Sequence, residues 1–222
     1  MCLSWLLVSS DSRSFRSSKS NSVAGSPDIN TQVALKFASE YPIAFLCDAQ
    51  QDLDQTVKVV QDTGGEIDLF KTDFSAKEHL SGSIAAVTTR FGKRCAAAIF
   101  QLHNDPNQRS FLEQTGVDIR KGAVLPITSA YVFAQQTVPL LLNHADGSAH
   151  PPTLLLAGTS GNSYSDEIND NCLVALMGSM GREFGKKGIH VCHIKYKKGL
   201  ETSSSDPDPK HVSYLQQLRA VM

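Results

Sequence analysis

Residues 33–47 read VALKFASEYPIAFLC, and this stretch decides the fold class. In its first half the apolar residues recur at the spacing of one helical face, which predicts a helix over residues 29–39. Residues 43–47 are apolar without interruption, which predicts a short strand covered on both faces. A helix that passes directly into a buried strand indicates an α/β domain.

The same alternation continues along the chain to residue 194. Further helices are predicted over residues 53–63, 75–91, 130–142 and 173–184, and further buried strands over residues 67–70, 95–100, 153–157 and 189–194. Right-handed crossovers join such units into a Rossmann-like, doubly wound parallel sheet, which is a three-layer α/β sandwich. Ligands of such sheets bind beyond the carboxyl ends of the strands.

Three segments are expected. Residues 1–22 form a flexible N-terminal segment that is rich in Ser and basic residues, residues 23–202 form the α/β domain, and residues 203–222 form a loop and a short helix. The apolar start, residues 1–8, allows three interpretations: a first β-strand, an irregular start, or the core of a secretory signal peptide that lacks a preceding basic residue. The last strand of the sheet is predicted to be missing.

Composition favours a small-molecule partner inside the cell. The 222 residues are 41% hydrophobic and carry a formal net charge of -1, which argues against nucleic acid or an anionic membrane as the main partner. The five cysteines contain no CxxC pair, which is typical of a reduced, cytoplasmic protein. No apolar run reaches transmembrane length.

Three segments together resemble the short-chain dehydrogenase/reductase superfamily. They are residues 33–47, the TDFS sequence of residues 72–75, and residues 180–193, which read MGREFGKKGIHVCH. The resemblance covers residues 23–202 and implies a doubly wound sheet that carries a nicotinamide cofactor. It also implies a possible homodimer, because such proteins often pair through the helices that here span residues 130–142 and 173–184.

The glycine-rich turn that holds the cofactor phosphates in this superfamily is not preserved. Its glycine positions are occupied by Ala24, Asp28 and Asn30, although Asp28 is also a common type of first-turn helix residue. An Asp at the end of the second family strand would repel a 2′-phosphate, so NAD is favoured over NADP if either binds. The resemblance assigns the remaining cofactor contacts to Ser26, Ile29, Asp48, Asp73, Gly199 and Thr202.

Asp73 has two interpretations. The corresponding family residue contacts the adenine ring, whereas an Asp at a strand-to-helix turn commonly acts as a cap. Ser75 and Glu78 have the spacing of a capping box for the helix that follows.

The catalytic Tyr-x-x-x-Lys pair of the superfamily is absent. Registration back from residues 180–193 places Asp166 and Asp170 at the Tyr and Lys positions. Two carboxylates raise the pKa of a nearby phenol, whereas catalysis needs it lowered. Ser160 and Tyr164 are the remaining weak candidates for catalysis. With Glu167, the two Asp residues are interpreted as a mostly structural, exposed acidic patch that would act as a general base only if buried.

Neither zinc chemistry nor Ser hydrolysis is indicated. The pairs His144/His150 and His190/His193 lack zinc-binding spacing, so no metal site is predicted. One member of the second pair should face solvent and the other a helix. Ser160 in Gly-Thr-Ser-Gly misses the nucleophile-elbow motif by one position.

Three functions remain open. The favoured one is a short-chain dehydrogenase-like protein of small-molecule or secondary metabolism with an eroded redox site, which binds a metabolite or performs non-redox chemistry. The second is an active NAD(P)-dependent oxidoreductase with a non-standard acid, for which Tyr164 and Ser160 are candidates. The third is a truncated product without function. Whether the protein is an enzyme stays open at this point.

Overall fold

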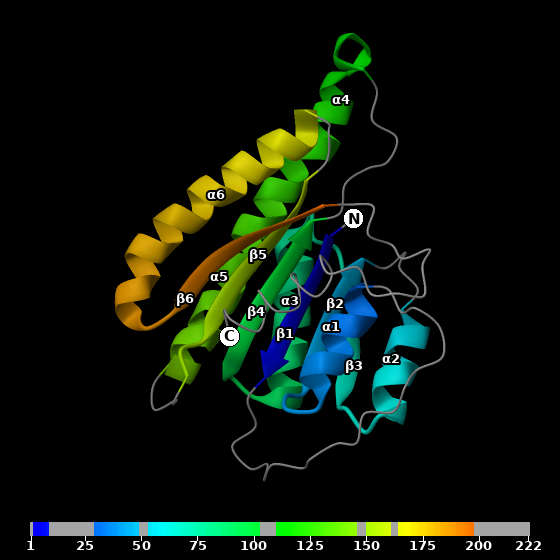
Figure 1. Ribbon diagram of the computed structural model, residues 1–222, viewed down its shortest axis with the longest axis vertical. Helices are drawn as coiled ribbons and strands as arrows, with labels where there is room; N and C mark the ends of the chain where they lie inside the picture. Colours follow the sequence, from blue (N-terminus) through cyan, green and yellow to red (C-terminus); the bar gives the residue numbers. More distant parts are fainter. Residues whose placement is uncertain are drawn as a thin grey trace.

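The computed structural model describes residues 2–8, 29–48, 53–102, 110–145, 150–160 and 164–197. These form one six-stranded sheet in the order β3-β2-β1-β4-β5-β6, with helices on both faces (Figure 1). The strands are β1 (Cys2–Val8), β2 (Ile43–Asp48), β3 (Ile67–Thr72), β4 (Cys95–Leu102), β5 (Thr153–Ser160) and β6 (His190–Lys197). The predicted Rossmann-like α/β class is confirmed.

Five α-helices longer than one turn connect or cover these strands in the described part of the chain. They are α1 (Ile29–Ala38), α2 (Asp54–Asp62), α3 (Lys77–Phe91), α5 (Leu125–Ala145) and α6 (Tyr164–Phe184). Shorter elements are η1 (Phe111–Glu113), α4 (Gly116–Ile119), the π-helix η2 (Arg120–Val124) and η3 (Gly185–Lys187). None of the helices described is long and apolar enough to cross a membrane.

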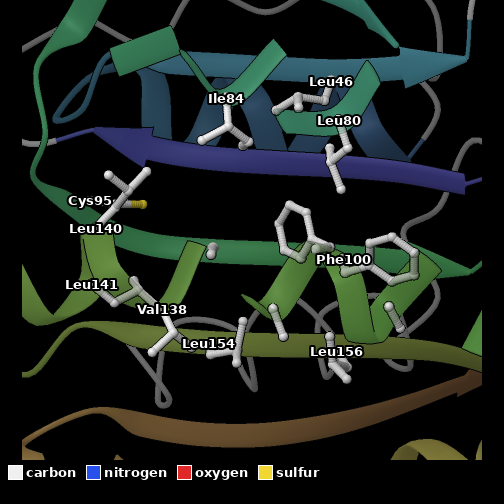
Figure 2. Packing of buried hydrophobic residues seen from close by; sticks show 14 of the residues in the cluster. Leu46, Leu80, Ile84, Cys95, Phe100, Val138, Leu140, Leu141, Leu154 and Leu156 are labelled. Carbon is white, nitrogen blue, oxygen red and sulfur yellow. The ribbon is translucent and has the colours of Figure 1, made fainter. Parts of the chain in front are cut away.

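Two apolar cores lie on opposite faces of the sheet. The larger core lies beneath α3, α5 and α6, where the ring centroid of Phe100 is 6.0 Å from that of Phe74 and 5.3 Å from that of Phe133. Figure 2 shows side chains of β2, β4 and β5 meeting those of α3 and α5 in this core. On the other face, α1 and α2 pack against Phe45 and Ile99. The structure is therefore the expected three-layer sandwich.

β1 departs from the predicted parallel sheet. It lies between β2 and β4 and runs antiparallel to both, with Leu3 opposite Cys47 and Cys2 opposite Leu102. The other strand pairs are parallel, and Figure 2 shows the arrow of β1 pointing against its neighbours. The expectation of a flexible segment is thus wrong for residues 2–8, where the strand interpretation is right. Residues 9–22 lie outside the described residues.

The reversal changes how β1 is connected to α1. β1 begins at the carboxyl edge of the sheet, beside Cys47 and Leu102, and ends at the amino edge, beside Cys95. α1 leads through a short connection into the start of β2 at that same amino edge, so α1 itself begins near the carboxyl edge. β1 therefore ends at the edge of the sheet opposite to the one at which α1 begins, so the two are not joined by a short turn at the carboxyl edge.

Two expectations concern the ends of the domain. Within the described residues no strand follows β6, and because the rest of the chain lies outside them, the absence of a last strand stays a prediction. Residues 198–222, with the predicted C-terminal loop and helix, lie outside the described residues.

Candidate functional site

A carboxylate and two nitrogen bases meet between α6 and β6. Lys195 Nζ donates a hydrogen bond to Asp170 Oδ2 at 2.7 Å, and His193 Nε2 lies 3.2 Å from Asp170 Oδ1. The exposed fractions of the side chains are 11% for Asp170, 14% for His193 and 49% for Lys195. We call these three residues the Asp170 cluster. The position that the resemblance assigns to the catalytic Lys thus holds the carboxylate of Asp170, and the cation paired with it is Lys195 of β6.

Strand and helix periodicity bring the cluster together. His193 and Lys195 are two residues apart on β6, so their side chains leave the same face of the sheet, toward α6. His190 is exposed, which confirms that one histidine of the pair faces solvent and the other a helix. Gly158 of β5 lies opposite Lys195, and a Cβ there would lie 3.1 Å from Asp170 Oδ1 and 3.3 Å from His193 Nε2. The absence of a side chain at Gly158 therefore allows this close approach.

Hydrogen bonding within the cluster is incomplete. Asp170 Oδ1 and His193 Nε2 are 3.2 Å apart, yet both are buried without an aligned hydrogen bond among the described residues. Burial lowers the pKa of His193 below its ordinary value of 6.5, an effect that the Asp170 charge opposes and the Lys195 charge reinforces. The imidazole is therefore neutral at neutral pH. Buried polar atoms without hydrogen bonds are uncommon in native proteins, and a catalytic role is one explanation for them.

The start of α6 is also buried. Ser165, Asp166 and Asn169 are all shielded from solvent, as Asp170 is, whereas Glu167 is exposed. The interpretation of an exposed acidic patch is therefore wrong for Asp166 and Asp170 and right for Glu167. The sequence pattern predicted a helix only from residue 173, whereas α6 begins at Tyr164. Its first two turns therefore pack against the protein and bury these carboxylates.

Asn169 fixes the start of α6 to the π-helix η2. Its Nδ2 donates a hydrogen bond to Gly122 O at 2.7 Å, and a Cβ at Gly122 would lie 2.9 Å from Ser165 Oγ. Pro126 has no N–H to offer the Gly122 carbonyl four residues earlier, and the irregular π-turn directly precedes α5. The irregular turn before α5 thus lies at the contact between η2 and the start of α6.

Of the two proposed catalytic candidates, Tyr164 and Ser160, only Tyr164 has a described side chain. Tyr164 is the first residue of α6 and is 56% exposed. Ser160 is the last residue of β5, opposite Lys197, and its side chain lies outside the described residues. The structure therefore leaves the Tyr164 side chain exposed at the start of α6, and a catalytic role of Ser160 stays a prediction.

The proposed cofactor contacts are only partly described. Asp48 and Thr72 are opposite one another at the carboxyl ends of β2 and β3. Asp73 accepts hydrogen bonds from Ser75 N at 2.8 Å and Ser75 Oγ at 2.6 Å, and these bonds are the first cause of its lowered pKa, ahead of the contact with His79. Asp73 thus has the role of a turn residue, while its contact with adenine stays a prediction.

The predicted capping box of Ser75 and Glu78 is wrong, because α3 begins after Ala76, which makes no side-chain cap, and the Ser75 hydroxyl is bonded to Asp73. Ile29 begins α1, without a described side chain. Ser26, Gly199 and Thr202 lie outside the described residues.

A nicotinamide dinucleotide does not fit the described residues in the way that the resemblance implies. The superfamily's phosphate-binding turn joins the first strand to the first helix at the carboxyl edge, whereas β1 here ends at the opposite edge. The position of the family Lys holds Asp170, which is already paired with Lys195. Among the described residues, no group of three or more His, Cys, Asp or Glu side chains is arranged to hold a metal ion.

Solved structures share this fold. An NADH-dependent reductase, A1-R', solved in complex with NAD, superposes with a TM-score of 0.68 and 13% identity over 79% of this chain and 76% of its own. A short-chain dehydrogenase from Rhodopseudomonas palustris gives 0.63 and 20% identity over 86% of both chains. A variant of a Serratia marcescens short-chain dehydrogenase/reductase gives 0.60 and 18% identity over 75% of this chain and 68% of its own.

These comparisons identify the fold of short-chain dehydrogenase/reductases. No protein-family model and no curated protein sequence matches the chain. With identities of 20% or less, the similarity concerns the fold, and the activity has to be argued from the site itself.

Proposed function

We propose that this protein, which has the fold of short-chain dehydrogenase/reductases, acts on a small metabolite without hydride transfer. The observation that carries the proposal is the hydrogen bond of Lys195 to Asp170 at the position where the resemblance expects a catalytic Lys. That position therefore has a negative charge, and the neighbouring cation is held by it. The metabolite is expected at the carboxyl edge of the sheet, where ligands of doubly wound sheets bind.

Electrostatics supports a role without redox chemistry. Hydride transfer to a carbonyl needs an acid next to the oxygen with its pKa lowered toward neutrality. Asp166 and Asp170 are both buried in α6, and a buried negative charge raises the pKa of a nearby phenol. Their arrangement therefore disfavours the standard proton donor.

Titration with NADH and with NADPH, followed by cofactor fluorescence, tests the proposal directly. We expect no saturable binding and no cofactor oxidation in the presence of a panel of aldehydes and ketones. Tight binding of either cofactor together with turnover of any panel member would overturn the proposal.

One observation favours the alternative of an active NAD(P)-dependent oxidoreductase: a protein of the same fold was solved with NAD. In that case Tyr164 or Ser160 has to supply the proton, and NAD is preferred because Asp48 repels a 2′-phosphate. Tyr164→Phe and Ser160→Ala would then each lower a measured turnover. If turnover exists and neither variant affects it, a different acid is responsible.

The assembly and location of the protein are part of the same proposal. The helices α5 and α6 expose apolar side chains, including Tyr131, Ile168 and Val174, which suits the homodimer that the resemblance implies. Cys47, Cys95, Cys172 and Cys192 are free, which supports the proposal of a reduced cytoplasmic protein. Its proposed partner is a small molecule and not nucleic acid. Sedimentation of wild type and of Val174→Asp distinguishes a dimer from a monomer.

A further inference from the structure

The Asp170 cluster lies near the carboxyl ends of its two strands. His193 pairs with Leu156 and Lys195 with Gly158, and both strands end a few residues later at the Ser160–Lys197 pair. A group at this level of the sheet is close to the edge where a ligand binds. Lys195, half-exposed, marks the side of the cluster that solvent reaches, while Asp170 and most of His193 are covered.

The contact with Asp170 selects one protonation form of His193. Nε2 is the ring nitrogen that lies 3.2 Å from the carboxylate oxygen, so the negative charge favours the neutral tautomer that carries its proton on Nε2, and Nδ1 remains as the proton acceptor. A carboxylate that orients an imidazole also stabilises the imidazolium that forms when the ring accepts a proton. Asp170 is therefore a positioning residue for His193.

Resting on the proposed function, we infer that the Asp170 cluster is a proton-transfer site, in which His193 removes a proton from the carbon next to the carbonyl group of a small ketone. Lys195 donates a hydrogen bond to the carbonyl oxygen. An uncharged substrate suits the site because the formal charges of Asp170 and Lys195 cancel while the imidazole is neutral.

The reaction balances without an electron carrier. Imidazole Nδ1 accepts the proton, the electron pair of the C–H bond forms the carbon–carbon double bond of an enolate, and the negative charge moves to oxygen. The ammonium group of Lys195 stabilises that charge. Return of the proton to carbon regenerates a ketone, so neither an oxidant nor a reductant is consumed.

Among the described residues, Asp170 and Lys195 are the charges that act on the imidazole. Lys195 comes from the same strand, Asp170 comes from α6, and β5 presents the uncharged Gly158. Burial keeps the pKa of His193 below 6.5, so the base form is populated at neutral pH. The rate of proton removal should therefore rise with pH through an inflection below 6.5 and then level off.

The experiment follows exchange of hydrogen for deuterium in deuterium oxide by proton NMR, with cyclohexanone and acetone as probes. We expect wild type to accelerate loss of the signal from hydrogens next to the carbonyl, with His193→Gln about 10²-fold slower. His190→Gln is the matched control, because it removes an exposed imidazole from the same strand, and it should leave the rate unchanged. The pH profile is a second readout, which a merely structural His193 would not produce.

If His193→Gln does not melt cooperatively, Lys195→Gln is tested in its place. The Lys195 side chain is half-exposed, and its substitution removes the hydrogen-bond donor to the enolate oxygen, so exchange should again be slower than in wild type. The inference is overturned by equal exchange in wild type and a folded His193→Gln, or by no acceleration of either probe. The proposed function fails separately: cofactor turnover would refute it whatever the exchange rates are, while a negative exchange result leaves the absence of hydride transfer standing.

Discussion

At the scale of single residues, Gly158 determines how closely the Asp170 cluster can pack. A methyl group there would lie 3.1 Å from Asp170 Oδ1 and 3.3 Å from His193 Nε2, tighter than ordinary van der Waals contact. We therefore expect Gly158→Ala to lower the free energy of unfolding by about 1 to 3 kcal/mol in urea denaturation. Gly82→Ala is the control, because nothing lies within 4 Å of its added Cβ, and in a helix it should stabilise. Gly158→Ala as stable as wild type would contradict this packing.

His193 should make stability depend on pH. Its pKa in the folded protein is lowered, chiefly by burial, so below 6.5 the unfolded chain binds more protons than the folded one. The contribution of His193 is thus complete above 6.5 and decreases as the pH falls through 6.5 toward the folded-state pKa. Urea denaturation from about pH 8 to about pH 5 should show this decrease in wild type and a smaller one in His193→Gln. An unchanged slope in the variant would show that the imidazole is not buried as described.

At the scale of elements, the hydrogen bond of Asn169 to Gly122 O holds the start of α6 against η2. Asn169→Ala leaves a partly buried carbonyl without this donor, which should cost about 1 to 3 kcal/mol in the free energy of unfolding. Asn143 makes the comparable bond to Lys93 O at 3.0 Å in an exposed position. Asn143→Ala should cost less, because water replaces the lost donor, and equal losses in the two variants would contradict the assigned burial.

The helices and buried strands were largely predictable because their signals are local. Periodicity at residues 33–47 located α1 and β2, and apolar runs located β4 and β5. The start of α3 was not predictable in the same way, since Ser75 has the spacing of a capping residue but its hydroxyl bonds Asp73. A capping box is formed instead by Thr115 and Asp118 at the start of α4, a helix that the sequence pattern did not predict.

The cluster itself could not be predicted because Asp170 and Lys195 are 25 residues apart and meet only when α6 packs on β6. Sequence registration identified the carboxylates at Asp166 and Asp170 but carried no information on their partners. The one local signal was the alternation His193-Ile194-Lys195, which places two basic side chains on one face of a strand.

At the scale of the whole molecule, the direction of β1 decides whether a phosphate-binding turn can exist. The antiparallel register places Leu3 opposite Cys47 and Leu7 opposite Ile43, whereas a parallel β1 would bring its far end toward Cys47. Directly opposed antiparallel residues have Cα atoms about 4.5 to 5.5 Å apart, which is within disulfide range. In a Cys2→Ser background, Leu3→Cys should therefore form a disulfide with Cys47 under mild oxidation, and Leu7→Cys should not. Peptide mapping by mass spectrometry identifies the bond; a Cys47 bond formed by Leu7→Cys and not by Leu3→Cys would show a parallel strand and restore the short turn at the carboxyl edge.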